Sequence, residues 1–214
     1  MILAGDIGGT KTVLGLFEDT VGGLRQVDEI VYGSQEHGAF EEILSNFSNT
    51  HAGQAVQAAC LGVAGPVIDG ACTATNLPWR ISEAGLARAL RTHKVKLVND
   101  LAAMAYGVLF LDDDEFATLN AGTRQKRQGH IAVIAAGTGL GEAFLYWDGE
   151  RYHPIATEGG HATFSPNSEQ EIELLSFLRA RFGGHVSYER VLSGPGLYHI
   201  YEFLRVSSDE PEQA

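Results

Sequence analysis

An amide and a carboxylate stand side by side at Asn99 and Asp100, where an apolar stretch at 95–98 gives way to a helical pattern. A carboxylate can accept a hydroxyl proton, and a neighbouring amide can orient the same hydroxyl compound. Open α/β sheets place ligand-facing residues where strands end and helices begin. Asp100 is therefore a candidate general base, and the alternative role of the pair is to cap the helix. The helix N-terminus favours the charged form, so we expect Asp100 to be ionised at neutral pH.

Two glycine-rich turns, each between two expected strands, could bind phosphate. They consist of Gly5, Asp6, Ile7, Gly8, Gly9, Thr10 and Lys11, and of Gly137, Thr138 and Gly139. Bare glycine N–H groups and the Thr10 hydroxyl can approach phosphate oxygens, and Asp6 could hold a metal-bound water. The first turn is not a P-loop, because Thr10 stands where that pattern needs glycine; a plain tight hairpin is the alternative. Two such turns in one chain favour a nucleotide held between two lobes.

Four further residues could bind a polyol. Glu158 and His161 flank a flexible two-glycine step and could donate to and accept from neighbouring hydroxyls, with metal binding as the rival interpretation. Glu189 is a further candidate, although its neighbour Arg190 offers a plain surface ion pair. Asn76 could present its amide to a ligand or could serve a structural turn.

The spacing of hydrophobic residues along the chain predicts the helices and strands that position these residues. The expected strands are 2–4, 13–17, 27–31, 55–63, 71–75, 95–98, 130–136 and 143–146. The expected helices are 39–47, a helix capped by Ser82 that ends near residue 92, 101–109, 168–182 and 197–204. The recurrence of a strand, a glycine turn and a strand suggests a duplicated α/β architecture. The acidic run at 112–115 predicts a solvated linker, so we expect one α/β domain at 1–110 and a second at 111–214.

The composition narrows the range of partners. The chain has 214 residues, 44% hydrophobic and 20% charged, which is typical of a globular protein. Its net charge of -12 disfavours nucleic acid and anionic membranes, although oriented N–H groups can still bind a small anion such as ATP. No signal peptide or long apolar run is present, and Cys60 and Cys72 are too few for a disulfide framework. We expect a cytoplasmic protein with reduced thiols.

Seven segments, in the same order, strongly resemble bacterial glucokinases, the hexokinase-like sugar kinases of the actin-like ATPase superfamily. They are GDIGGTKT, GVAGPV, TNLPW, LVNDLAAMA, AAGTGLG, TEGGHATFSPNSEQE and SYERVLSGPGL. The resemblance implies an actin-like, ribonuclease H-like fold with a small N-terminal domain and a larger second domain. It also implies ATP- and Mg²⁺-dependent phosphorylation of the glucose 6-hydroxyl.

The resemblance also assigns roles to the candidate residues. Asp100 matches the catalytic base, and the two glycine turns match the loops that hold the ATP phosphates. The residues that match the sugar-binding set are Asn99, Glu158, His161 and Glu189, to which we add Asn76. Too few cysteines for a zinc cluster and the lack of an N-terminal helix-turn-helix disfavour the related sugar-responsive repressors.

One departure from the family concerns length. Members of the family are longer by about half, and the further part carries the adenosine-binding glycine motif and more of the large domain. We therefore expect an incomplete second domain, intact sugar-binding residues, weak adenine binding, and weak or absent turnover. Exposed apolar surface on the incomplete domain would favour a homodimer or aggregation. A kinase for another hexose and a non-catalytic sugar-binding fragment remain the alternatives.

Overall fold

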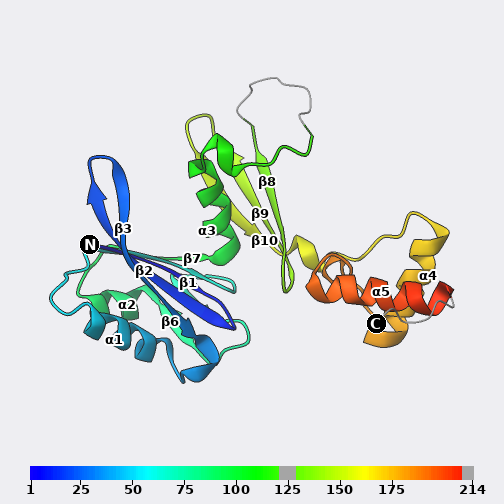
Figure 1. Ribbon diagram of the computed structural model, residues 1–214, viewed down its shortest axis with the longest axis horizontal. Helices are drawn as coiled ribbons and strands as arrows, with labels where there is room; N and C mark the ends of the chain where they lie inside the picture. Colours follow the sequence, from blue (N-terminus) through cyan, green and yellow to red (C-terminus); the bar gives the residue numbers. More distant parts are fainter. Residues whose placement is uncertain (121–128, 209–214) are drawn as a thin grey trace. The chain divides into compact units, whose positions relative to one another are not determined.

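The computed structural model of the chain describes residues 1–120 and 129–208. The chain divides into two compact units, Met1–Val108 and Leu109–Ala214, and each is considered by itself (Figure 1). Within the described ranges, no helix has the length and apolar character needed to cross a lipid bilayer. Cys60 and Cys72 are free thiols, as expected.

The first unit is built on a five-stranded mixed sheet with the strand order β3-β2-β1-β4-β7. Its strands are β1 (Ile2–Ile7), β2 (Lys11–Thr20), β3 (Gly23–Gly33), β4 (Ala58–Val63) and β7 (Val95–Asn99). β1, β2 and β3 are antiparallel neighbours, whereas β1, β4 and β7 run parallel. The carboxyl ends of these three parallel strands therefore meet at one edge of the sheet, where open α/β sheets bind their ligands.

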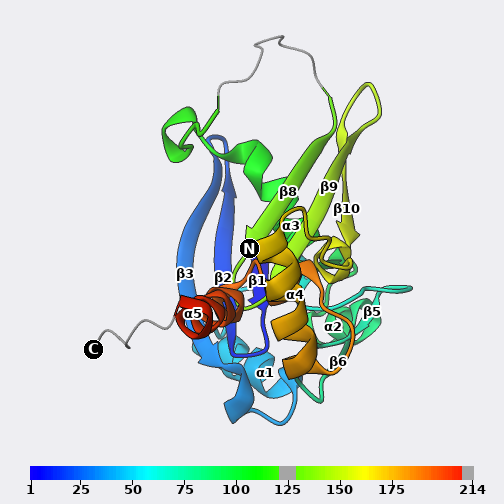
Figure 2. The same ribbon diagram turned by 90° about the vertical axis from the view of Figure 1, so that its right-hand side faces the viewer.

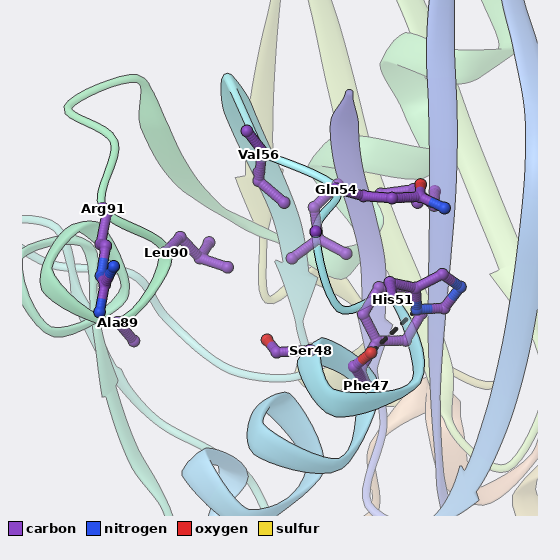
Figure 3. Close-up of a pocket in the computed structure, with 12 residues that line it drawn as sticks. Phe47, Ser48, His51, Gln54, Val56, Ala89, Leu90 and Arg91 are labelled. Atoms are coloured by element: carbon purple, nitrogen blue, oxygen red, sulfur yellow. Dashed lines mark hydrogen bonds between the residues drawn. The ribbon is translucent and has the colours of Figure 1, made fainter.

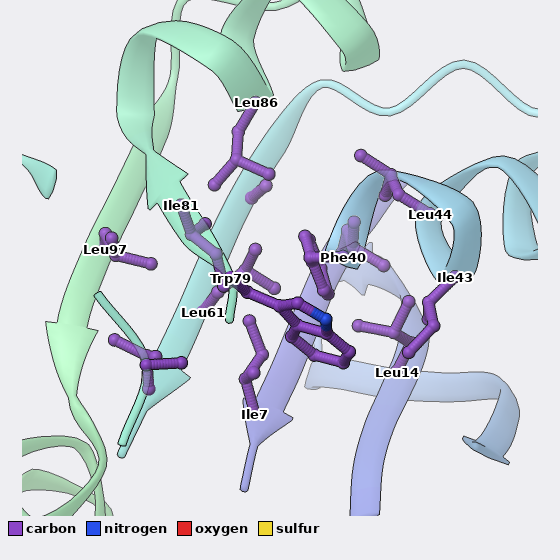
Figure 4. Packing of buried hydrophobic residues seen from close by; sticks show 14 of the residues in the cluster. Ile7, Leu14, Phe40, Ile43, Leu44, Leu61, Trp79, Ile81, Leu86 and Leu97 are labelled. Carbon is purple, nitrogen blue, oxygen red and sulfur yellow. The ribbon is translucent and has the colours of Figure 1, made fainter. Parts of the chain in front are cut away.

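Helix α1 (Phe40–Thr50) packs against this sheet through one apolar stripe. The buried residues of the stripe are Phe40, Ile43, Leu44 and Phe47, at the spacing that predicted an amphipathic helix. They share one core with β1, β2 and β4, and the indole of Trp79 lies among them (Figure 4). The helix predicted at 39–47 is thus confirmed, and it continues for another three residues.

A short hairpin, β5 (Ala71–Thr73) and β6 (Arg80–Ser82), leads into helix α2 (Glu83–Leu90). The Ser82 Oγ accepts a hydrogen bond from the Gly85 N–H at 3.1 Å, so Ser82 is the predicted N-cap. Strand β6 was not predicted, because three residues are too few to show an alternating pattern. After β7, helix α3 (Asp100–Gly107) is followed by the 3₁₀ turns η2 (Val108–Phe110) and η3 (Asp113–Glu115), and the acidic run is exposed as expected.

The second unit contains a three-stranded antiparallel sheet and two helices. Strands β8 (Ile131–Ala136), β9 (Leu140–Trp147) and β10 (Tyr152–Thr157) lie side by side in the order β10-β9-β8 (Figures 1 and 2). Two 3₁₀ turns, η4 (Gly159–His161) and η5 (Tyr188–Arg190), accompany helices α4 (Glu169–Phe182) and α5 (Gly194–Ser208). The core around these helices consists of Phe164, Leu174, Leu178, Val186, Val191 and Phe203.

Three elements of this unit differ from the sequence prediction, and the first is β9, which begins at Leu140 instead of residue 143. Strand β10 was missed because Pro154 interrupts a segment with little apolar alternation. Helix α5 begins three residues before the predicted start at Leu197, because the Ser193 Oγ accepts a hydrogen bond from the Gly196 N–H at 3.0 Å. Pro195 is tolerated there, since a first-turn N–H has no partner within a helix. The predicted pattern of two strands joined by a glycine turn is present in each unit, as β1-β2 in the first and β8-β9 in the second.

Candidate active site

The predicted site residues of the first unit gather at the carboxyl ends of the parallel strands. Gly5, Asp6 and Ile7 are the last residues of β1 and Lys11 is the first of β2, so the first glycine turn itself is reduced to residues 8–10. Asn99 and Asp100 join β7 to α3. Gly62 of β4 lies between β1 and this junction, since a Cβ added there would come within 3.5 Å of the Asp100 Cα and 3.7 Å of the Gly5 carbonyl oxygen. The sheet therefore brings the candidate base near the candidate metal residue.

Asn99 both caps helix α3 and holds Asp100. Its Oδ1 accepts a hydrogen bond from the Ala102 N–H at 3.1 Å, which is an N-cap contact. Its Nδ2 donates to the Gly65 carbonyl oxygen at 3.2 Å and to Asp100 Oδ1 at 2.9 Å. Both protons of the amide are therefore used within the protein, and the predicted contact between Asn99 and a sugar would fall on Oδ1.

The Asp100 carboxylate is fixed through one of its two oxygens. Asp100 Oδ1 accepts hydrogen bonds from the Leu101 N–H and from Asn99 Nδ2, each at 2.9 Å. With these bonds on Oδ1, Oδ2 is the oxygen suited to accept a proton from a substrate.

Burial raises the pKa of Asp100 above the ordinary value of an aspartic acid, and the negative charge of Asp6 raises it further. Hydrogen bonds from the Leu101 N–H and Asn99 lower this pKa but do not outweigh burial. The prediction from the sequence rested only on the helix N-terminus, which favours the charged form, whereas the net shift of the pKa is in the opposite direction. A raised pKa makes the carboxylate a better proton acceptor than an ordinary aspartate.

The first glycine turn presents N–H groups, while the carbonyl groups of Gly8, Thr10 and Lys11 are occupied. The Gly8 N–H donates to the Lys11 carbonyl oxygen at 3.0 Å, and the Gly8 and Thr10 carbonyl oxygens accept hydrogen bonds from Ser34. Among the described residues, no acceptor pairs with the N–H groups of Gly9 and Thr10. Exposed donors with occupied acceptors suit an anion, whereas a plain hairpin does not require this arrangement.

Asn76 lies against this turn. Its backbone is left-handed, with φ of 62°, and a Cβ added to Gly9 would lie 3.6 Å from the Asn76 Cβ. The surrounding segment is also a tight turn, closed by the Ala74 N–H donating to the Trp79 carbonyl oxygen at 3.0 Å. The structural turn considered from the sequence is therefore present, and it brings Asn76 to the glycine turn.

The predicted residues of the second unit gather around Leu140, the first residue of β9. The Leu140 N–H donates to Glu189 Oε2 at 3.0 Å. Gly137 closes the second glycine turn by donating to the Gly139 carbonyl oxygen at 2.9 Å, and its own carbonyl oxygen accepts from the Gly194 N–H at 2.8 Å. Thr138 lies at the exposed tip of this turn.

The two-glycine step between Glu158 and His161 is required by packing. A Cβ on Gly160 would lie only 2.1 Å from the Leu140 carbonyl oxygen, so no other residue fits without a backbone shift. Steric room, and not only backbone freedom, therefore accounts for glycine at this step. The Glu158 and His161 side chains are both exposed, with Oε2 and Nε2 3.7 Å apart, and both can reach a ligand.

Glu189 and Arg190 have separate roles. The Glu189 carboxylate accepts from Leu140 and fills the space in which Gly139 would carry a Cβ, 2.5 Å from that position. The Arg190 guanidinium lies over the Phe182 ring at 4.3 Å. Among the described residues, no ion pair joins Glu189 to Arg190, so the surface-pair alternative does not hold.

Asp6 fits a Mg²⁺ ion better than a metal that needs several protein ligands. The described residues contain no cluster of three or more His, Cys, Asp or Glu side chains able to bind a metal. Mg²⁺ keeps several water ligands and takes one or two carboxylates together with substrate phosphates. The single exposed carboxylate of Asp6, next to a turn rich in N–H donors, suits this coordination.

A cavity of about 430 Å³ in the first unit lies away from these residues (Figure 3). Leu3 and Val56 place it near the amino ends of β1 and β4, opposite the edge that carries Asp100. Both ring nitrogens of its His51 are occupied, by the Phe47 carbonyl oxygen and by Asp28, each at 2.9 Å. The lining of the cavity contains no carboxylate, and its other ionisable side chain is Arg91, so it offers no general base comparable to Asp100.

Ser34 was not among the predicted residues, although it bonds to the first glycine turn from the far end of β3. Ser34 and its partner Thr12 are fully buried. Only the three-dimensional pairing of β2 with β3 brings these two residues together, because no short sequence pattern links positions 22 residues apart.

The mixed sheet, with its carboxylates and glycine turn at the carboxyl ends of parallel strands, defines an actin-like ATPase fold of the sugar-kinase type. The crystal structure of a glucokinase from an Antarctic psychrotroph superposes with a TM-score of 0.81 at 29% identity, covering 100% of this chain and 66% of that one. The family model described as Glucokinase matches residues 3–214. The chain therefore belongs to the glucokinase family.

Curated relatives agree with this assignment. The glucokinase of Synechocystis sp. is 41% identical over 224 residues, covering 99% of this chain and 63% of the relative. The glucokinase of Nostoc sp. is 38% identical over 222 residues, covering 100% of this chain and 64% of the relative. The chain thus spans slightly less than two thirds of the length of these relatives.

Proposed function

We propose that the protein transfers the γ-phosphoryl group of ATP to the 6-hydroxyl of glucose. The observation that carries this proposal is the position of Asp100 near Asp6 and the first glycine turn, at the carboxyl ends of three parallel strands. Membership of the glucokinase family supports the choice of both substrates. In phosphoryl transfer the protein acts mainly by positioning and by stabilising charge, and residues of these types can do both.

Asp100 would act as the general base. The glucose 6-hydroxyl gives its proton to Asp100 Oδ2, its oxygen forms a bond to the γ-phosphorus, and the bond from that phosphorus to the leaving oxygen of ADP breaks. Oδ1 stays bound to the Leu101 N–H and to Asn99, so the carboxylate keeps its orientation as it takes the proton. The raised pKa of Asp100 favours this transfer.

The glycine turns would hold the phosphates of ATP. Free N–H groups at Gly9 and Thr10 would donate to phosphate oxygens, and Lys11 would add a positive charge nearby. Asp6 would bind Mg²⁺ through one carboxylate oxygen or an ordered water. When bound, Mg²⁺ neutralises charge that develops on the phosphoryl group.

The sugar hydroxyls would be held by Glu158, His161 and Glu189, with Asn99 and Asn76 as further contacts. Glu189 is suited to this role because one oxygen accepts from Leu140 while the other remains available to a hydroxyl. Several acceptors aimed at particular hydroxyls give selectivity, because an epimer would leave unpaired an acceptor that the bound sugar covers, at a cost of about 1–3 kcal/mol.

We also propose that the two units correspond to the small domain and part of the larger domain, and that the protein works in the cytoplasm.

The proposed homodimer is supported by Phe144 and Ile155, cross-strand partners whose side chains are exposed on the second unit. Sedimentation velocity of the chain tests it, since a strictly monomeric species at all concentrations would contradict it.

A sugar kinase must bind both of its substrates, and calorimetry can test each of them. We expect glucose to bind the 214-residue chain, galactose to bind at least tenfold more weakly, and Glu158→Gln to weaken glucose binding. Glu173→Gln, an equivalent change at an exposed position of α4, should leave it unchanged. Mg²⁺–ATP should also bind. A folded chain that binds neither substrate would overturn the proposal, and binding of glucose without ATP would favour a non-catalytic sugar-binding protein.

A further inference from the structure

Ser34 makes an unusual set of contacts to the first glycine turn. Its Oγ donates to the Gly8 carbonyl oxygen at 2.7 Å, and its backbone N–H donates to the Thr10 carbonyl oxygen at 3.0 Å. The same Oγ lies 2.9 Å from the Thr12 Oγ1. One residue thus binds two carbonyl groups of the turn.

The direction of the hydroxyl contact follows from the number of protons. A serine hydroxyl has one proton, and the Ser34 proton is used on the Gly8 carbonyl oxygen. The Thr12 hydroxyl must therefore donate to Ser34 Oγ, which gives a chain from Thr12 to Ser34 to Gly8. Both side chains are fully buried, so water does not replace either bond if one partner is removed.

This chain of hydroxyls determines which groups the turn presents. With the Gly8 and Thr10 carbonyl oxygens bound to Ser34 and the Lys11 carbonyl oxygen bound to the Gly8 N–H, the turn's donors at Gly9 and Thr10 remain available. If the Gly8 carbonyl oxygen were released, the peptide between Gly8 and Gly9 could rotate, because glycine permits either sign of φ. A rotated peptide would place a carbonyl oxygen where an anion must bind.

The second glycine turn also has a carbonyl group held by a donor from outside the turn. The Gly137 carbonyl oxygen accepts from the Gly194 N–H at 2.8 Å. In the second turn the bond is between backbone groups, whereas in the first turn it depends on a side chain. Only the first turn can therefore be released by a point substitution that deletes a hydroxyl.

We propose that Ser34, oriented by the Thr12 hydroxyl, is a positioning residue that holds the first glycine turn in its phosphate-accepting conformation. This inference rests on the proposed function, which makes the turn a phosphate loop. It assigns a role to two residues that do not touch the substrate.

The test uses the 214-residue chain with matched substitutions. Ser34→Ala and Thr12→Val each delete one hydroxyl, and Thr12→Val keeps the shape of the side chain. Thr12→Ser keeps the hydroxyl and should restore wild-type behaviour. Ser82→Ala is the control, because it deletes a serine hydroxyl that caps α2 and does not contact the turn.

Two readouts separate positioning from general stability. Hydrogen exchange of the Gly8 N–H reports on the turn itself, and calorimetric titration with Mg²⁺ and tripolyphosphate reports on anion binding. We expect Ser34→Ala and Thr12→Val to speed Gly8 exchange and to weaken tripolyphosphate binding, each by about tenfold, as loss of a buried hydrogen bond implies. Thr12→Ser and Ser82→Ala should stay within about twofold of the wild type.

Equal effects of Ser34→Ala and Ser82→Ala on Gly8 exchange would overturn the proposal. If Ser34→Ala does not fold, Thr12→Val decides by the same comparison. If the wild-type chain binds no tripolyphosphate, the proposed phosphate role of the turn fails. The positioning role is then decided by Gly8 exchange alone, so the two failures are distinguishable.

Discussion

Replacing Asn99 by alanine would remove three hydrogen bonds where β7 meets α3. Loss of the N-cap bond to the Ala102 N–H costs about 1 kcal/mol. Loss of the two bonds from Nδ2, to Gly65 and Asp100, adds about 0.5–1.5 kcal/mol each at a partly exposed position. The expected total is about 2–4 kcal/mol. Asn99→Ser keeps a capping oxygen, so it should cost about 1 kcal/mol less than Asn99→Ala.

Urea unfolding measures this difference. Trp79 is buried in the core of the first unit, so its fluorescence, in a Trp147→Phe background, follows that unit. Equal losses of stability for Asn99→Ser and Asn99→Ala would refute the capping role. Both variants also lose the donor to Asp100, so the pKa of Asp100, followed by carbon-13 NMR titration, should rise further in each. A pKa that falls or stays unchanged would refute the contact between Asn99 and Asp100.

Three other changes test separate parts of the structure. Because the pKa of Asp100 is raised in the folded chain, ionisation of Asp100 lowers the free energy of unfolding at pH values above this raised pKa. At pH values below the ordinary pKa of about 4, the group is protonated in both states and the effect is absent. Asp100→Asn should therefore resist urea better than the wild type at pH 7, and the gain should disappear as the pH falls to about 4; a gain that is independent of pH would contradict this. Gly160→Ala places a Cβ 2.1 Å from the Leu140 carbonyl oxygen and should cost about 1–3 kcal/mol in urea unfolding. Gly137→Ala, with nothing within 4 Å of the new Cβ, is the control and should cost little. Trp79→Ala removes an indole that is 2% exposed and should cost about 3–5 kcal/mol in the same assay; a loss below about 1 kcal/mol would contradict the packing shown in Figure 4.

The parts of this structure that follow from local patterns could be predicted from the sequence. The spacing of Phe40, Ile43, Leu44 and Phe47 predicted α1, because helical periodicity is a property of neighbouring residues. The junction at Asn99 and Asp100 was recognisable as the end of a strand and the start of a helix. The glycine turns were recognisable because glycine and threonine cluster between two apolar segments.

What the sequence could not show depends on contacts between distant residues. The Ser34 contacts require β2 and β3 to pair in one register, which no single segment specifies. The sign of the pKa shift at Asp100 depends on burial and on Asp6, which become visible only once the sheet is assembled. The steric need for glycine at 160 was not visible either, because the close neighbour, the Leu140 carbonyl oxygen, is 20 residues away in the chain.

The measurement that tests the central claim most directly is phosphoryl transfer itself. The purified chain, in excess over Mg²⁺–ATP and glucose, would be followed by phosphorus-31 NMR, which detects slow formation of glucose 6-phosphate. The account predicts that glucose 6-phosphate forms, and that Asp100→Asn slows its formation by about 10²–10⁴-fold. Asp114→Asn, in the exposed acidic run, should leave the rate unchanged. Equal rates of product formation with and without the Asp100 carboxylate would contradict it.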